Sequence, residues 1–261
     1  MNIKINDILI FCMKRLVCYF KTFVLTLLII GLNSCLSNND GYSLDEYRMS
    51  YATARPINDN SFFFSLDNGA TLWPASPLYL PFQPQRPQRV QINYTLLGRR
   101  VQGYDYAVKV NRVDTILTKT LSADMQEKND SIYGKDPLKL EDLWIGDGFL
   151  NIIFEIEYSG RFKHSVNLLC DTTDGYKLDV RYNAFEDKSD LLRYGIVAFD
   201  LSSIDTRGKD VELIIKVNTF EGVKEYKSRY NSLAQTKATD IQPELKLELQ
   251  PELKLDKNSL E

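Results

Sequence analysis

Apolar and polar residues alternate with a period of two along most of the chain, which is the pattern of half-buried β-strands. The sequence Asp67-Asn68-Gly69 predicts a turn between two such runs. The alternation shifts by one residue near Arg112, which predicts a β-bulge. Five prolines between 74 and 87 predict an extended loop. The alternating runs of this first block lie at 49–53, 62–66, 71–73, 90–96 and 104–110. Five short strands in this length predict a small β-barrel.

A second block of alternating residues begins near residue 151. The turn Glu221-Gly222 separates its last two runs. Six or seven short strands at regular spacing predict an antiparallel β-sandwich, in which each sheet buries one face. The runs lie at 152–158, 166–170, 176–182, 196–199, 211–217 and 223–226.

These blocks predict an all-β protein with a barrel over 43–118 and a sandwich over 139–230. Residues 119–138 are polar, with one helical turn, and we expect a linker there. From 231 to 261 the chain repeats Gln-Pro-Glu-Leu-Lys-Leu at residues 242 and 250, and we expect a disordered spacer. A docking function for this tail is the alternative.

The beginning of the sequence resembles a secretory leader. Positive residues, among them Lys14 and Arg15, precede an apolar run of about ten residues, which is too short to span a bilayer. We expect residues 1–34 to be a signal peptide. Residues 1–12 add nothing to this pattern, so Met13 is the candidate true start.

The apolar run closes with Leu32-Asn33-Ser34-Cys35, which is similar to the lipobox of bacterial lipoproteins. This motif predicts that Cys35 carries acyl chains such as palmitate. Each buried methylene of such a chain contributes about 0.8 kcal/mol to membrane binding, so several chains would anchor the protein firmly. Residues 35–42 would then be a polar, lipid-anchored tether. An uncleaved anchor, or an ordinary signal with a chance cysteine, is the alternative. The sequence does not distinguish the periplasmic from the surface face of the envelope; we expect the outer membrane.

The charge of the chain argues against nucleic acid as a partner. The formal net charge is −3, and removing the four basic residues and one acidic residue before Cys35 makes it −6. Phosphate backbones bind basic grooves, and no basic stripe is present.

The inventory of reactive side chains argues against an enzyme. His164 is the only histidine of the 261 residues, and no nucleophile motif accompanies it. We expect a hydrogen-bonded structural or surface histidine rather than a catalytic one. Cys170 shares an alternating face with Val166 and Leu168, which predicts a core position. With Cys35 acylated, Cys170 has no intrachain partner, and we expect no disulfide, metal site or cofactor.

Two further sets of residues are candidates for chemistry. Paired carboxylates could serve a glycosidase, but no pair stands out, because the candidate aspartates lie at turns where local hydrogen bonding favours them. We expect the run Phe62-Phe63-Phe64 and Trp73 to fill the barrel core rather than to form a sugar platform. The aspartates concerned are Asp67, Asp147, Asp174 and Asp200.

Several stretches resemble the NigD-like lipoproteins of Bacteroidota. The N-terminal resemblance rests on residues 40–45, 62–69 and 72–74. The C-terminal one rests on residues 143–145, 149–152, 164–168 and 195–201. The family implies an OB-like barrel followed by a β-sandwich, and its name implies bacteriocin immunity. Tyr182 stands where the family's histidine is expected, and the tail after Asn231 lies outside the family pattern.

These observations lead to one functional hypothesis and its alternatives. We expect a non-catalytic lipoprotein of the cell envelope that binds a protein partner, with bacteriocin immunity as the suggested role. A carbohydrate-binding accessory lipoprotein is the runner-up, by analogy of fold alone. An enzyme is the third reading.

Overall fold

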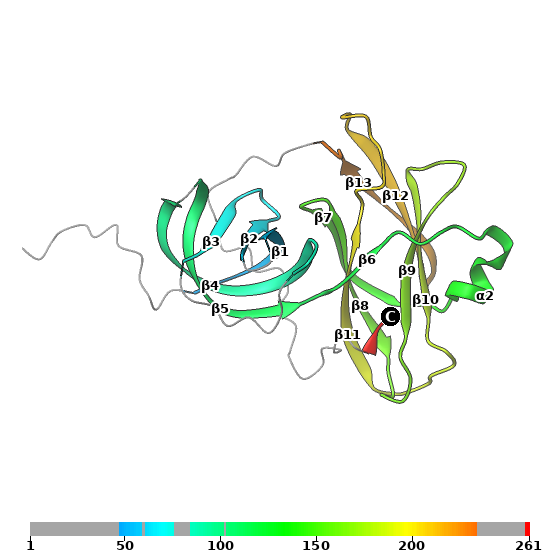
Figure 1. Cartoon of the computed structure of the whole chain (residues 1–261). Coiled ribbons are helices and arrows are strands. Elements are labelled where there is room, and N and C mark those ends of the chain that lie inside the picture. Colours follow the sequence, from blue (N-terminus) through cyan, green and yellow to red (C-terminus); the bar gives the residue numbers. More distant parts are fainter. Residues whose placement is uncertain (1–46, 59–60, 76–83, 102, 234–258) are drawn as a thin grey trace, which may run out of the picture. The chain divides into compact units, whose positions relative to one another are not determined.

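The computed structural model describes residues 47–58, 61–75, 84–101, 103–233 and 259–261, and strands dominate them (Figure 1). The leader, the tether and the anchor Cys35 all lie outside the described residues. The described residues belong to one compact unit. Among the described helices, none is long and apolar enough to cross a membrane.

The first block folds into the predicted five-stranded barrel, closed in the order β1-β2-β3-β5-β4. Side chains on the alternating face, such as Phe64, Leu72 and Ile92, fill its interior and have no exposed surface. Asn93 pairs with Arg112 while Tyr94 pairs with Val110, so the predicted bulge is confirmed. The strands are β1 (Arg48–Asn58), β2 (Ser61–Leu66), β3 (Thr71–Pro74), β4 (Gln88–Val101) and β5 (Tyr104–Thr115).

The second block forms the predicted β-sandwich of two four-stranded sheets, ordered β13-β12-β10-β9 and β6-β11-β8-β7. Two pairings, β10 with β12 and β11 with β6, are parallel, so the sheets are mixed rather than wholly antiparallel. The strands are β6 (Leu117–Thr120), β7 (Lys139–Gly146), β8 (Phe149–Glu157), β9 (Ser165–Cys170), β10 (Lys177–Asn183), β11 (Leu192–Asp200), β12 (Val211–Thr219) and β13 (Gly222–Tyr230).

The segment expected to be a linker belongs to the sandwich. Strand β6 pairs with β11, and Ser122 forms a bridge with Leu169. The Lys119 ammonium donates to the carbonyl oxygen of Val166 at 2.9 Å and to the side chain of Asn167 at 2.7 Å. The prediction of a linker from polar composition is wrong here, because these polar side chains form hydrogen bonds with the sheet. The short helices η2 (Gln126–Lys128) and α2 (Asn129–Tyr133) follow.

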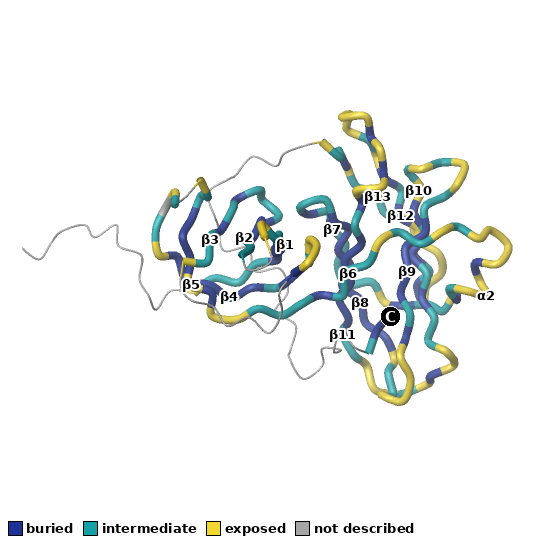
Figure 2. The backbone as a smooth tube through the Cα atoms, viewed as in Figure 1, coloured by how far each residue is buried: buried dark blue, intermediate teal, exposed yellow. Residues whose placement is uncertain are grey.

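Strand β8, in the sheet β6-β11-β8-β7, is buried on both faces. Every residue of β8 from Phe149 to Ile156 is buried, which Figure 2 shows as a dark blue stretch. One face, with Leu150 and Phe154, packs into the core between the two sheets. The other face, with Phe149 and Ile153, packs against residues of the barrel. Barrel and sandwich therefore share a second, smaller core.

Residues Ser259–Glu261 are also part of the sandwich. The expectation of a disordered tail is wrong for Ser259–Glu261, because Leu260 is only 4% exposed and pairs with His164 in a parallel bridge. The repeats at 242 and 250 lie outside the described residues.

Candidate functional site

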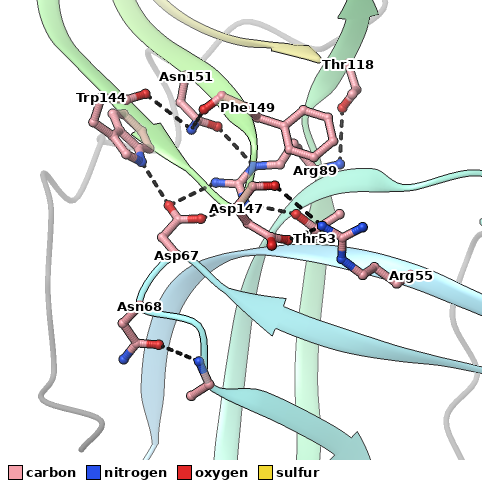
Figure 3. A network of polar contacts seen from close by, with 11 residues as sticks. Thr53, Arg55, Asp67, Asn68, Arg89, Thr118, Trp144, Asp147, Phe149 and Asn151 are labelled. Carbon is pink, nitrogen blue, oxygen red and sulfur yellow. Dashed lines mark hydrogen bonds and ion pairs between the residues drawn. The ribbon is translucent and has the colours of Figure 1, made fainter. Parts of the chain in front are cut away.

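Arg89 of β4 is the centre of a polar network between barrel and sandwich (Figure 3). Its neighbour Val90 faces the barrel interior, so Arg89 points outward, yet its side chain has no exposed surface. The guanidinium donates to both carboxylate oxygens of Asp67, from Nη1 at 2.7 Å and from Nη2 at 3.0 Å. This fork geometry is the strongest form of an arginine–carboxylate pair.

Asp67 is placed by the turn between β2 and β3. The side chain of Asn68 accepts a hydrogen bond from the Ala70 amide, and Gly69 takes a φ of 84°, which closes the turn. The Asp67 carboxylate is therefore free to reach Arg89 and to accept a hydrogen bond from Trp144 Nε1 at 2.8 Å. The expectation that Asp67 serves local turn bonding is wrong, since its partners lie on β4 and β7.

Asn151 of β8 holds Arg89 from the sandwich side. Its Oδ1 accepts from Arg89 Nε at 3.0 Å, and its Nδ2 donates to the carbonyl oxygens of Phe149 at 3.1 Å and Trp144 at 3.4 Å. These contacts fix the orientation of the amide. The guanidinium also lies 5.6 Å from the centre of the Phe149 ring, a cation–π distance.

Apolar side chains pack around the Arg89 end of this network, whereas the Asp67 side chain is 22% exposed and lines the cleft described below. The ring centres of Tyr51 and Trp144 are 4.9 Å apart. Burial raises the pKa of Tyr51 to about 12, and the nearby Asp142 carboxylate adds to this effect. The surrounding residues are Tyr51, Ile116, Trp144, Phe149, Ile153, Ile196 and Ala198.

The backbone of Gly146 in β7 lies very close to the Asp67 carboxylate. A Cβ atom added at Gly146 would lie 2.2 Å from Asp67 Cγ, so only glycine fits beside that carboxylate. A buried ion pair contributes little net stability against apolar substitutes, but it costs several kcal/mol when one partner is removed. The network therefore fixes how the barrel and the sandwich meet.

A cleft of about 830 Å³ opens beside this network, with walls from both domains. Arg55 of β1 and Asp147 of the β7–β8 turn form an ion pair at 2.9 Å on its lining. Asp147 and Gly148 take φ values of 49° and 84°, as the two central residues of a type I′ hairpin turn require. Phe63 lies on the barrel wall, and Arg229 lies on the sandwich wall.

The lining of the cleft is suited to binding. It presents side chains of both charges, Arg55 and Arg229 against Asp147 and Asp200, next to the aromatic ring of Phe63. Binding sites commonly lie between domains and combine apolar surface with a few placed polar groups. Within the described parts of the chain, no group of three or more His, Cys, Asp or Glu side chains is placed to hold a metal ion.

The sequence-predicted histidine is structural, as expected. His164 has no exposed surface, its Nδ1 lies 2.6 Å from the Tyr182 hydroxyl, and its Nε2 lies 3.0 Å from Asp187 Oδ2. Burial opposes ionisation of Asp187, but the hydrogen bonds from Ser159 and His164 lower its pKa. Tyr182, at the position where the family's histidine is expected, is thus a direct partner of His164.

Cys170 packs against the sandwich core, but it is half-buried and not fully buried as its alternation predicted. Its Sγ is 3.4 Å from the Gly175 carbonyl oxygen, and burial raises the pKa of the thiol. A thiol held in its protonated form is a poor nucleophile.

The aromatic cluster of the barrel divides between interior and surface. Phe64 fills the barrel core as expected. Phe63 and Trp73 do not, because both are only partly buried and pack against Tyr104, with ring centres 5.1 Å apart in each case. The Trp73 and Tyr104 rings are stacked, with 20° between their planes. Phe63, Trp73 and Tyr104 therefore form an outer aromatic group, of which Phe63 also lines the cleft.

Arg89 could not be singled out from the sequence. Alternation places it on the outer face of a barrel strand, where an arginine is ordinarily solvated. The useful signal lay in β8, where Ile153 interrupts the polar face of Asn151 and Glu155. An apolar residue on that face indicates that a second layer covers it.

Comparison with known proteins agrees with this architecture. The NigD-like N-terminal OB domain matches residues 51–116, and the NigD-like C-terminal beta sandwich domain matches residues 121–230. Among curated proteins, nothing matches the chain.

Three solved structures share the fold. A protein described as toxin-related, from Parabacteroides distasonis, is 39% identical with a TM-score of 0.67, over 72% of this chain and 94% of its own. A protein of unknown function from Bacteroides vulgatus is 23% identical, with a TM-score of 0.58 over 74% and 94% of the two chains. A NigD-like immunity protein from Bacteroides caccae is 19% identical, with a TM-score of 0.52 over 74% and 99%. The two matched domains, in this order, show that the chain belongs to the NigD-like family.

Proposed function

We propose that this protein is a non-catalytic lipoprotein of the cell envelope, anchored through Cys35, whose interdomain cleft binds a protein partner. The role that we propose for this binding is immunity to a bacteriocin. The observation that carries the proposal is the cleft of about 830 Å³, whose walls come from two domains that Arg89 holds in one arrangement.

A rigid cleft favours binding because little conformational entropy is lost when the partner docks. The charged side chains on both walls provide electrostatic complementarity, which contributes more to specificity and to the association rate than to affinity. Arg55 and Asp147 pair with each other across the domains, so a partner that approaches them meets a preorganised polar surface.

The lipid anchor is supported by the sequence Leu32-Asn33-Ser34-Cys35 after an apolar run. An immunity protein held at the membrane can intercept a toxin before the toxin reaches its target. The non-catalytic role is supported by His164, whose two ring nitrogens are both engaged in the sandwich core. The names of the relatives point in the same direction, since one is described as toxin-related and another as an immunity protein.

A survival assay tests this function. A strain that lacks the gene is challenged with concentrated bacteriocin preparations from related Bacteroidota, and survival is compared with that of complemented strains. The intact gene is expected to restore survival. Cys35→Ser should fail to restore it at equal protein level, since the protein would no longer be held at the membrane.

The cleft has its own control in the same assay. Arg55→Glu places like charges beside Asp147 and should reduce protection, whereas Arg112→Glu, at an exposed pair on the barrel with Asp114, should not. Equal survival of the deletion strain and all complemented strains, for every preparation, would count against immunity.

Carbohydrate binding is a second candidate, favoured by the outer aromatic group. Stacked rings such as Trp73 and Tyr104 offer apolar faces on which sugar rings can pack. A glycan array tests it: binding that disappears in Trp73→Ala but persists in Phe220→Ala, an exposed phenylalanine of the sandwich, would support this candidate.

A further inference from the structure

Strand β9 is the last strand of its sheet, and residues Ser259–Glu261 lie along its beginning, where Leu260 forms a parallel bridge with His164. The His164 amide donates to the Ser259 carbonyl oxygen at 3.0 Å, and the Glu261 amide donates to the His164 carbonyl oxygen at 2.8 Å. The Val166 amide donates to a main-chain oxygen of Glu261 at 3.0 Å. Exposed strand edges attract such additions, because their backbone groups lack partners.

The side chain of Leu260 gives this contact an apolar component. Leu260 is 4% exposed and belongs to the core cluster between the two sheets, together with Val166 and Tyr182. Because side chains alternate along a strand, the residues on either side of Leu260 point away from the core. The edge of β9 therefore includes a pocket that accepts one leucine side chain.

The neighbouring charge favours an acidic residue after the leucine. The Lys119 ammonium is hydrogen-bonded to Val166 and Asn167, next to the position of Glu261. Burial lowers the pKa of Lys119, and the charge of Glu261 opposes this shift. An acidic residue at this place thus stabilises a partly buried cation.

We infer that the edge of β9 from His164 to Val166 is a binding site for an extended peptide of the pattern polar–leucine–acidic, and that Ser259–Glu261 is its occupant within the chain. The ligand class is a peptide strand that adds to the sheet, with main-chain hydrogen bonds for affinity and the leucine pocket for specificity. This peptide site is separate from the interdomain cleft, because none of its edge residues lines the cleft.

The sequence before the docked segment contains the same pattern twice. Lys246-Leu247-Glu248 and Lys254-Leu255-Asp256 both place an acidic residue after a leucine. Three further leucines of this stretch, at 245, 249 and 253, are followed by Lys or Gln. The chain therefore provides a test set and a matched control of equal size and chemistry.

The experiment compares two triple variants of the full chain. Leu247, Leu255 and Leu260 become Asp in the test variant, and Leu245, Leu249 and Leu253 become Asp in the control. Hydrogen exchange is measured at the amides of His164 and Val166, with Val180 of β10 as a report on global folding. We expect exchange at His164 and Val166 to accelerate by about tenfold or more in the test variant only, because local opening frees these amides.

Binding of a free peptide completes the test. A fluorescein-labelled peptide of sequence Lys-Asn-Ser-Leu-Glu, identical to residues 257–261, is titrated into each variant. The test variant should bind it, whereas a peptide with Leu replaced by Asp should not bind. The control variant and the unaltered chain should bind the peptide more weakly, because their own segment competes for the edge.

Two results would overturn the inference. One is unchanged protection of His164 and Val166 in a test variant whose Val180 amide stays protected; the other is a test variant that binds neither peptide. Should the test variant fail to fold, millimolar peptide is added to the unaltered chain and its amide resonances are recorded. Shifts at His164 and Val166 then support the site, and their absence refutes it.

Discussion

Arg89 of the barrel donates a hydrogen bond of 3.0 Å to Asn151 of the sandwich, and neither side chain has any exposed surface. The two residues belong to different domains, so this bond can form only when barrel and sandwich are docked. Separating the domains would break this bond and expose the apolar side chains of the core that the two domains share, which costs free energy. We therefore expect the two domains to unfold as one cooperative unit.

Removing the charge of Asp67 should show how strongly the network depends on its ion pair. In Asp67→Asn, Arg89 keeps a buried positive charge without a carboxylate, which should lower the free energy of unfolding by about 3 kcal/mol. Asp114→Asn breaks an exposed pair with Arg112 and should cost less than about 1 kcal/mol. Urea unfolding of both variants makes the comparison, and equal losses would contradict the role of the network.

Gly146→Ala tests the close approach between domains without changing any charge. The added methyl group would lie 2.2 Å from Asp67 Cγ, so the carboxylate must move away from Arg89. Overpacking of this kind typically costs about 1–3 kcal/mol. Gly175→Ala, with nothing within 4 Å of its Cβ position, should change stability by less than about 0.5 kcal/mol. Thermal unfolding distinguishes the two, and a neutral Gly146→Ala would refute the packing described here.

The interface should weaken at alkaline pH through Tyr51. Burial raises the pKa of this phenol from 10.0 to about 12, so above pH 10 the unfolded chain loses a proton that the folded protein retains. Stability from this group is complete below pH 10 and falls as pH rises to 12, by up to about 2.5 kcal/mol.

The matched variants Tyr51→Phe and Tyr47→Phe isolate that effect. Tyr51→Phe should lose less stability than the unaltered chain between pH 10 and 12, since phenylalanine does not titrate. Tyr47 is 65% exposed, and its replacement should leave the pH profile unchanged. Parallel profiles for all three proteins, measured by urea unfolding, would contradict this assignment.

The hydrogen bond between Tyr182 and His164 should be important for the sandwich. Tyr182→Phe removes the hydroxyl that lies 2.6 Å from Nδ1, and the buried ring nitrogen then lacks a partner, at a cost of about 1–3 kcal/mol. Tyr176→Phe, which removes an exposed bond to the Asp205 carbonyl oxygen, should cost less than about 0.5 kcal/mol. Equal midpoints in chemical denaturation would show that the buried bond has no special role.

Much of the fold could be predicted because each sheet buries its alternating side chains. The five barrel strands and the bulge near Arg112 follow from this periodicity, as do the runs that became β8 and β12. The grouping of these runs in two blocks, together with the family resemblance, predicted an OB-like barrel followed by a sandwich, and the matched domains agree.

The features that escaped prediction depend on contacts between distant segments. Strand β6 is only four residues long and pairs with β11, about eighty residues later, so no local pattern marks it. Arg89 looks like a solvated residue until the sandwich covers it. Leu260 is one of many leucines in a polar tail, and only the edge of β9 distinguishes it.

The most direct test of the proposed function is whether a protein occupies the cleft in intact cells. A photo-reactive benzoylphenylalanine is incorporated at Phe63, on the wall of the cleft, or at Phe220, which is 60% exposed in the β12–β13 turn. We expect irradiation to link position 63 to one envelope or toxin protein, and position 220 to give no such product. The same products from both positions, or none from position 63 in cells exposed to bacteriocin preparations, would contradict the proposed function.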